Sequence, residues 1–337
     1  MANFKTRRVG KTALEVTELA FGGGSMSGNF VEVPDEQARA AVGAALDAGI
    51  NYIDVAPQYG LGRGEHLVGD ALRDRRQGVV LSTKVGGLLR PYAGNKPRGT
   101  WVKPFPFQIV YDYTYDAIMR SYEDSLQRLA IAEIDILYVH DLGEMTHGKE
   151  QNAVHWKNFW DGGGYRALQE LKSSSRIKAI GLGVNEWQVL LDAMKLGDWD
   201  IFLLAGRYTL LEQTSLAFLG TCLERNVSVL AAAPFNGGAL MGTGKWNYGD
   251  APRDVVDRVA ALEAFCKDHE VPIGAAALQF PCAHPAVVSV LVGPKSAAEV
   301  RANVDWWNFP IPDAFWDDLA EAKLVAPGTP LPGGLTA

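Results

Sequence analysis

Two hydrophobic patterns alternate along this chain: short apolar runs, and longer segments in which apolar residues recur every three to four positions. The apolar runs predict strands that are buried on both faces. They lie at 19–22, 51–55, 79–85, 134–140, 178–183, 201–206, 227–234 and 287–293. The longer segments predict amphipathic helices between the strands. These lie at 35–49, 65–75, 116–129, 165–174, 186–197, 213–226, 253–270 and 296–307.

The strand and helix predictions alternate through almost the whole chain, as β-strand followed by α-helix. Eight such pairs predict an α/β fold of the (β/α)8 TIM-barrel type. A doubly wound sheet is the alternative, but it calls for a G-x-G-x-x-G motif at the start of the first helix. The stretch FGGG at 21–24 does not have that spacing. We therefore expect one barrel domain over residues 1–337.

Two segments, 86–113 and 141–163, interrupt this regular order. Both are rich in aromatic residues, and we expect them to be long loops. Each one follows a predicted strand, so in a barrel both lie over the C-terminal face, where barrel enzymes carry their active sites. Long loops in compact domains are usually functional or disordered, and the aromatic content speaks against disorder.

Composition and charge narrow the class of protein. The 337 residues are 47% hydrophobic with a net charge of −7, which argues against a nucleic-acid-binding face. No apolar run is long enough to span a membrane, and no secretory signal is visible. The three cysteines are scattered, without metal-ligand spacing. We expect a cytoplasmic protein with no metal site and a small-molecule substrate; the sequence leaves the oligomeric state open.

Four ionisable residues lie at or just beyond the C-terminal ends of consecutive predicted strands: Asp54, Tyr59, Lys84 and His140. In a barrel these positions converge on one rim. A lysine beside a tyrosine favours the phenolate, so we expect Lys84 to lower the pKa of Tyr59. That suits an acid/base that exchanges a proton with a carbonyl or hydroxyl oxygen. Each residue alone also has an ordinary structural explanation, such as a cap or an ion pair.

Five stretches in order resemble the aldo-keto reductase family. They are TRRVGKTALEVTELAFGGG at 6–24, NYIDVAPQYG at 51–60, STK at 82–84, DSLQRLAIAEIDILYVHD at 124–141 and SVLVGPKSAAEVRANV at 289–304. The resemblance implies a barrel oxidoreductase with a hairpin before its first strand. It implies Tyr59 as the acid/base, Lys84 and Asp54 as the groups that tune it, and His140 as the residue that orients the substrate.

The resemblance also implies a nicotinamide cofactor, NAD with NADP as the alternative. The positions implied to bind it are Gly23, Asp54, Asn185, Arg207, Pro234, Phe235, Gly237, Leu240, Gly293, Ser296, Glu299 and Asn303. Ala232 stands where many members have a tyrosine that stacks on the nicotinamide. Arg207 has two possible roles. It contacts the cofactor or the substrate, or it forms an ion pair with Glu212.

Glu299 bears on the choice between NAD and NADP. It stands where members that prefer NADP often have an arginine for the 2′-phosphate. A carboxylate there repels a phosphate and accepts a hydrogen bond from a ribose hydroxyl, so NAD is expected. Lys295 is the competing feature, since it is within reach of a phosphate, and Glu299 has the alternative of being a solvated helix residue.

The resemblance implies an NAD(P)-dependent dehydrogenase acting on CH–OH. The stretches GLGVNEW and LLAGRYTLLEQ are most similar to aldose 1-dehydrogenases, so the expected reaction oxidises the C1 hydroxyl of L-fucose, L-galactose or D-arabinose to the lactone. The alternatives are oxidation of pyridoxal to 4-pyridoxolactone and general carbonyl reduction with NADPH. Tyr59 and His140 would meet the substrate, with Trp101, Trp156 and Trp160 as candidate pocket walls or as loop packing.

Two alternatives from other classes stay open at this point. One is a barrel that binds nicotinamide without turnover, as a regulatory subunit. The presence of all four residues of the acid/base set argues against it. The other is a metal-dependent hydrolase using histidines such as His147 and His155, whose spacing matches no recognised zinc arrangement.

Overall fold

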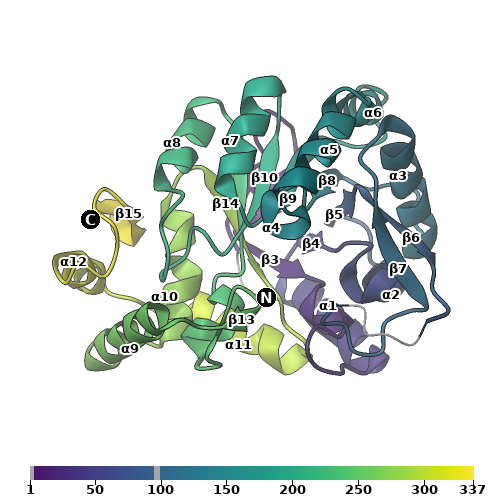
Figure 1. Cartoon of the computed structure of the whole chain (residues 1–337). Helices are drawn as coiled ribbons and strands as arrows, with labels where there is room; N and C mark the ends of the chain where they lie inside the picture. The colour runs from purple at the N-terminus through teal and green to yellow at the C-terminus, as the bar shows by residue number, and fades with distance from the viewer. Residues whose placement is uncertain (1–3, 95–98) are drawn as a thin grey trace.

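A closed barrel of eight parallel strands forms the centre of the computed structural model, which describes residues 4–94 and 99–337 (Figure 1). The strands are β3 (Leu19–Gly22), β4 (Tyr52–Asp54), β5 (Val80–Val85), β8 (Ile136–His140), β9 (Ala179–Val184), β10 (Ile201–Ala205), β11 (Ser228–Ala232) and β14 (Val287–Val292). The strands follow one another around the barrel in chain order, and β14 pairs with β3 to close it. Every strand predicted from the apolar runs is present, so the barrel prediction is confirmed.

Helices cover the outside of the barrel. Those that overlap the predicted helices are α1 (Asp35–Ala48), α2 (Arg63–Leu72), α3 (Tyr115–Leu129), α6 (Gly164–Ser173), α7 (Trp187–Leu196), α8 (Leu216–Glu224), α9 (Arg253–Asp268) and α11 (Ala297–Trp307). Gly49 ends α1 with φ 95°, a left-handed conformation that glycine adopts without strain. The helical period therefore predicted where the helices lie, and capping residues such as Gly49 determine where they end.

The sequence pattern missed helices after β11 and near the C-terminus. Helix α10 (Ile273–Gln279) packs against α9 and α11, and its central residues Gly274 to Leu278 are all buried. A helix covered on most sides has no polar face, so it shows no amphipathic period. Helix α12 (Asp313–Glu321) and the short hairpin β15 (Pro330–Leu331) and β16 (Leu335–Thr336) follow in the region that the sequence left unassigned.

Both predicted long loops contain regular structure, which corrects the expectation of irregular insertions. Segment 86–113 carries the antiparallel hairpin β6 (Gly87–Pro91) and β7 (Phe107–Tyr111), and its residues 95–98 lie outside the described part. Segment 141–163 carries α4 (Glu144–His147) and α5 (Lys149–Trp160). Helix α5 spaces its apolar residues irregularly, so the period that identifies a surface helix is weak there.

Several short elements complete the rims. They are β1 (Thr6–Arg8), β2 (Glu15–Thr17), β12 (Lys245–Trp246), β13 (Gly249–Asp250) and the 3-10 turns η1 (Ser25–Ser27), η2 (Tyr59–Gly62), η3 (Asn236–Met241), η4 (Pro281–Ala283) and η5 (Pro332–Gly334). The antiparallel pair β1–β2 is the hairpin that the family resemblance implied. No helix in the described ranges combines the length and the apolar character needed to cross a membrane.

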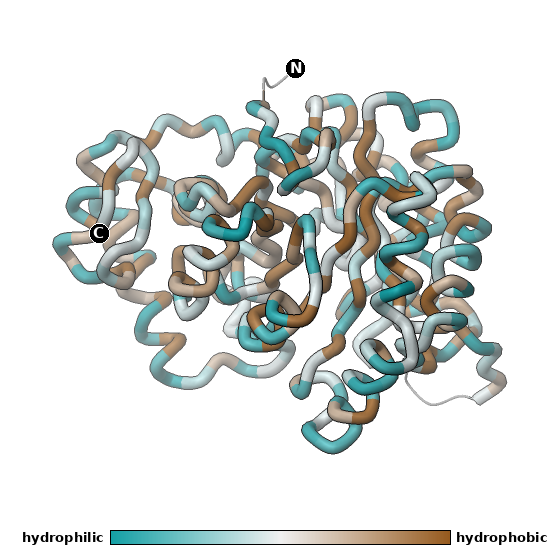
Figure 2. Tube along the Cα trace, turned by 90° about the horizontal axis from the view of Figure 1, so that it is seen from above, coloured by the Kyte–Doolittle hydropathy of each residue, from teal (hydrophilic) through white to brown (hydrophobic). Residues whose placement is uncertain are grey.

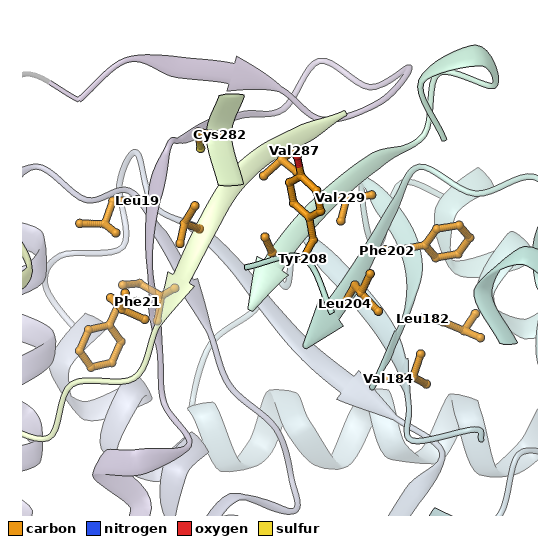
Figure 3. Close-up of a cluster of buried hydrophobic side chains, with 14 of the residues drawn as sticks. Leu19, Phe21, Leu182, Val184, Phe202, Leu204, Tyr208, Val229, Cys282 and Val287 are labelled. Atoms are coloured by element: carbon orange, nitrogen blue, oxygen red, sulfur yellow. The ribbon is translucent and has the colours of Figure 1, made fainter. Parts of the chain in front are cut away.

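The core has two parts that follow from the alternation of side chains along each strand. Residues such as Phe21, Leu182 and Leu204 face outward and pack beneath the helices (Figure 3). The alternate residues form a second cluster within the barrel, which includes Val9 and Leu14 from the β1–β2 hairpin. Figure 2 shows apolar segments on the inner strands and hydrophilic turns at the periphery. The hairpin packs on the N-terminal end of the barrel, which leaves the C-terminal rim for a site.

Candidate active site

A buried ion pair lies at the C-terminal ends of β4 and β5. The Lys84 Nζ donates to Asp54 Oδ2 at 2.6 Å and to the carbonyl of Val55 at 3.0 Å, while Ser82 Oγ donates to Asp54 Oδ1 at 2.7 Å. Both charged side chains are at most 1% exposed. Burial lowers the pKa of Lys84, but Asp54 and Tyr59 outweigh it, so the pKa is raised and the ammonium stays charged.

Tyr59 begins η2, the turn that follows β4, and its ring lies 4.6 Å from Lys84 Nζ, measured to the ring centroid. Gly60 and Leu61 both have positive φ, so the chain bends sharply just after Tyr59. Burial raises the pKa of Tyr59 to about 12, and the charge of Lys84 offsets only part of this. Lys84 thus lowers the pKa of Tyr59 as expected, but burial outweighs the nearby charge, so the pKa ends above its usual value.

His140 ends β8 and meets Tyr59 edge-on, with 5.9 Å between ring centroids. Burial, followed by the charge of Lys84, lowers the pKa of His140 well below its usual value. The imidazole is therefore neutral at pH 7 and has one N–H to donate. The Tyr113 hydroxyl donates to the His140 carbonyl at 2.8 Å and fixes the end of the strand. The structure thus brings together the four residues that the sequence singled out.

Of the three tryptophans expected to line the substrate pocket, the structure places only Trp101 against the catalytic set. Its ring lies 5.8 Å from that of Tyr59. Trp160 instead packs against Trp156, Tyr165 and Trp199, in the apolar layer outside the barrel. Trp156 and Trp160 thus show the packing that was the alternative to a pocket wall, since Trp160 lies against Tyr165 of α6 and Trp199 before β10, and Trp156 lies against Trp160.

Replacing Trp160 by alanine should lower the free energy of unfolding by about 3–5 kcal/mol, because the ring leaves a cavity in a packed aromatic cluster. The substrate KM should change little. Replacing Trp101 by alanine should do the opposite, with a higher KM and a smaller stability loss. Urea denaturation and steady-state kinetics on both variants test this, and a large KM effect in Trp160→Ala would restore its place in the pocket wall.

The first of the implied cofactor residues, Gly23, lies next to the catalytic set. The Gly23 amide donates to the Asp54 carbonyl at 2.7 Å, and Asn185 Nδ2 donates to the Ala205 carbonyl at 3.2 Å. Arg207 donates through Nε to the Asn185 carbonyl at 3.0 Å and pairs with Glu212 at 3.2 Å. The ion-pair alternative for Arg207 is therefore present, and its bond to Asn185 keeps it beside the rim.

The loop after β11 contains the glycine-rich segment expected to cover a pyrophosphate. Gly237 is exposed, with φ 69° and open space where a Cβ would stand. Pro234 and Leu240 are buried, and Phe235 packs edge-on against Trp306. The side chain of Leu240 belongs to the core, so only its backbone is available to a ligand.

The side-chain amide of Asn236 in the same loop shows whether this region is suited to binding a dinucleotide. Its Nδ2 donates to the Gly206 carbonyl at 3.1 Å. Its Oδ1 is buried and has no hydrogen-bond partner among the described residues. A buried acceptor without a donor costs free energy, unless a ligand supplies the donor. The amide and hydroxyl donors of a nicotinamide dinucleotide fit this requirement.

The remaining cofactor candidates lie between β14 and α11. Ser296 caps α11 and accepts a hydrogen bond from the Glu299 amide at 3.2 Å. Glu299 Oε2 accepts from the Lys295 amide at 2.8 Å, so its carboxylate is held at the helix N-terminus. Gly293 is exposed and Asn303 is buried. Glu299 is therefore part of a cap, while its side chain stays 45% exposed and pairs with Lys295 Nζ at 3.7 Å.

Three residues near the catalytic set were not singled out from the sequence. Asp141 follows His140 directly, Tyr111 contacts Gln58 at 3.4 Å, and Tyr248 stands on the turn between β12 and β13. The position of Asp141 after a strand-end histidine was a usable signal. The position of Tyr248 was not, since no pattern in the sequence indicates where a distant turn lies in space.

The family of the chain follows from comparison with known proteins. The model of the Aldo/keto reductase family matches residues 18–323. A pyridoxal 4-dehydrogenase of Microbacterium luteolum is 43% identical over 95% of this chain and 98% of its own. A D-threo-aldose 1-dehydrogenase of a Pseudomonas species is 35% identical over 93% and 95%. The holo form of an aldo-keto reductase from Bacillus halodurans superposes with a TM-score of 0.74 at 27% identity, covering 96% and 97%. The chain belongs to the aldo/keto reductase family.

Proposed function

We propose that this enzyme oxidises pyridoxal to 4-pyridoxolactone with NAD, and that an aldose is the second candidate substrate. This reverses the order expected from the sequence stretches, because the relative named for pyridoxal is the more similar, at 43% against 35% identity. The two reactions share one chemistry. Pyridoxal and aldoses both form cyclic hemiacetals, and oxidation of the hemiacetal carbon gives a lactone in each case.

The observation that carries the proposal is the charged Lys84–Asp54 pair under the ring of Tyr59. Tyr59 takes the hydroxyl proton of the hemiacetal as its phenolate, and the Lys84 ammonium stabilises that phenolate. A nicotinamide held at this rim would supply the acceptor for the hydride of the same carbon. The substrate thus loses one O–H and one C–H bond and gains a C=O bond. Neutral His140 donates a hydrogen bond to the reacting oxygen and orients it.

This role for Tyr59 predicts how oxidation depends on pH. Its pKa is raised to about 12 by burial, so the phenolate is a small fraction at neutral pH. That fraction grows about tenfold per pH unit below the pKa, and kcat/KM reports the free enzyme. We expect kcat/KM for oxidation to rise from neutral pH upward, over the range in which the substrate keeps the proton on its ring nitrogen. A flat profile of kcat/KM over this range would remove Tyr59 as the base.

The preference for NAD rests on the Glu299 carboxylate at the N-terminus of α11. A carboxylate there repels a 2′-phosphate, and like charges placed together cost several kcal/mol. The Glu299→Gln variant keeps an oxygen for the Lys295 amide but removes the charge. We expect its kcat/KM with NADP to rise about tenfold or more, which is about 1.4 kcal/mol, while the value with NAD stays nearly constant. Glu263→Gln, an exposed change on α9, is the control.

The activity is tested by following NADH formation with pyridoxal, L-fucose, L-galactose and D-arabinose, each with NAD and NADP. Turnover of pyridoxal with NAD and a lactone product support the proposal. Turnover of sugars alone would keep the catalytic residues and make the aldose the substrate. No oxidation of any of them would contradict both candidate functions.

A further inference from the structure

Asp141 forms the turn that leaves β8, and the turn uses only its backbone. Its φ is 53°, a left-handed conformation that aspartate and asparagine tolerate better than most residues. Its amide donates to the Gly183 carbonyl at 3.0 Å, and its carbonyl accepts from the Gly143 amide at 2.8 Å. These bonds use backbone atoms alone, so the carboxylate is available to accept a hydrogen bond from a ligand.

The carboxylate of Asp141 is four-fifths buried and has no cationic partner at hydrogen-bond distance among the described residues. Within the described ranges, the nearest ion-pair contact of Asp141 joins its Oδ1 to His140 Nε2 at 3.7 Å, and that imidazole is neutral. Burial raises the pKa of Asp141 to about 6, Lys84 opposes this, and Glu186 adds to it. The group is therefore ionised at pH 7 although it lies in a costly environment.

The Asp141 carboxylate lies next to the catalytic set, because its Oδ1 is 3.7 Å from His140 Nε2. Titratable groups on several elements interact electrostatically with this carboxylate: Lys84 on β5, Tyr111 on β7, Tyr113 before α3, His140 on β8, Glu186 before α7 and Tyr248 between β12 and β13. His147 on α4 bonds instead to the Asp141 backbone. Burial comes first in raising the pKa of Tyr111, and the charge of Asp141 comes second. Asp141 is thus an acceptor at the edge of an aromatic-walled site.

We propose that Asp141 determines substrate specificity by accepting a hydrogen bond from a donor on the ring of the hemiacetal. The inference rests on the proposed function and names the feature that the site recognises. Asp141 Oδ1 lies 3.7 Å from His140 Nε2, so a ring whose reacting oxygen is bound by His140 is within reach of the carboxylate. In pyridoxal the donor is the pyridinium N–H of the zwitterionic 3-hydroxypyridine; in an aldose it is the C2 hydroxyl, next to the anomeric carbon.

The test compares wild type with Asp141→Asn, since asparagine keeps the shape and tolerates the left-handed backbone. Pyridoxal is paired with 2-(hydroxymethyl)benzaldehyde, which closes to the same hemiacetal without a ring nitrogen. D-arabinose is paired with 2-deoxy-D-ribose, which lacks the hydroxyl next to the anomeric carbon. We expect kcat/KM of the variant to fall about 10- to 100-fold on the donor-bearing member of the active pair. On the analogue it should change less than about threefold.

Equal losses on both members of a pair would overturn the inference, since Asp141 would then act through His140 or the fold. Wild-type turnover of the sugars without pyridoxal would refute pyridoxal as substrate and leave Asp141 to be judged on the sugar pair. If wild type oxidises neither pair, both proposals fail. Asp161→Asn, an exposed change after α5, controls for the loss of a charge.

Discussion

Replacing Tyr59 by phenylalanine is expected to lower kcat for hemiacetal oxidation by about 10²- to 10⁴-fold, the usual contribution of a positioned acid/base. The hydroxyl is the group that takes the proton, and the ring that packs against Trp101 and Lys84 is retained. Binding of NADH should therefore stay within about threefold of wild type, since little binding energy is lost. Steady-state kinetics and a fluorescence titration with NADH measure the two quantities.

The matched control is Tyr115→Phe. Tyr115 begins α3, and its hydroxyl donates to Glu170 on the surface, away from the catalytic set. Its kcat should equal that of wild type. If Tyr59→Phe turned over at a rate within a few-fold of this control, another group would have to supply the base and the assignment would be lost.

Replacing Lys84 by methionine should cost both stability and turnover. Asp54 would keep its bond from Ser82 but lose the cation that balances its charge in a fully buried position. Removing one partner of a buried ion pair typically lowers the free energy of unfolding by about 3–5 kcal/mol. Turnover should fall as well, because nothing then offsets the burial that raises the pKa of Tyr59.

A second variant separates the two effects of this change. In Lys84→Met/Asp54→Asn the buried negative charge is also removed, so much of the lost stability should return while turnover stays low. Urea denaturation and kcat of both variants give the comparison. A double variant as unstable as the single one would show that the charge balance between Lys84 and Asp54 is not what the fold requires.

The barrel and its catalytic set are predictable because both depend on local patterns. A strand buried on both faces must be apolar throughout, so a polar residue where the run ends is conspicuous. Asp54, Lys84 and His140 stand at such ends, and the parallel register brings them to one rim. The motif spacing added Tyr59, which no periodic pattern marks.

What the sequence did not predict depends on tertiary contacts. Helix α10 is buried on most faces and so lacks an amphipathic period. The direction of the Trp160 ring is set by how α5 packs on α6. The pKa of Tyr59 depends on how far the folded chain shields its hydroxyl from water. The residue types around it do not reveal this.

In the proposed reaction, a hydride leaves the hemiacetal carbon of pyridoxal while Tyr59 takes the hydroxyl proton. The most direct measurement uses pyridoxal deuterated at C4′ with NAD, followed by mass spectrometry of the reduced cofactor. The account predicts that the reduced cofactor carries the deuterium and that Tyr59→Phe forms almost none of it. Reduced cofactor without deuterium, or none with wild type, would contradict the account.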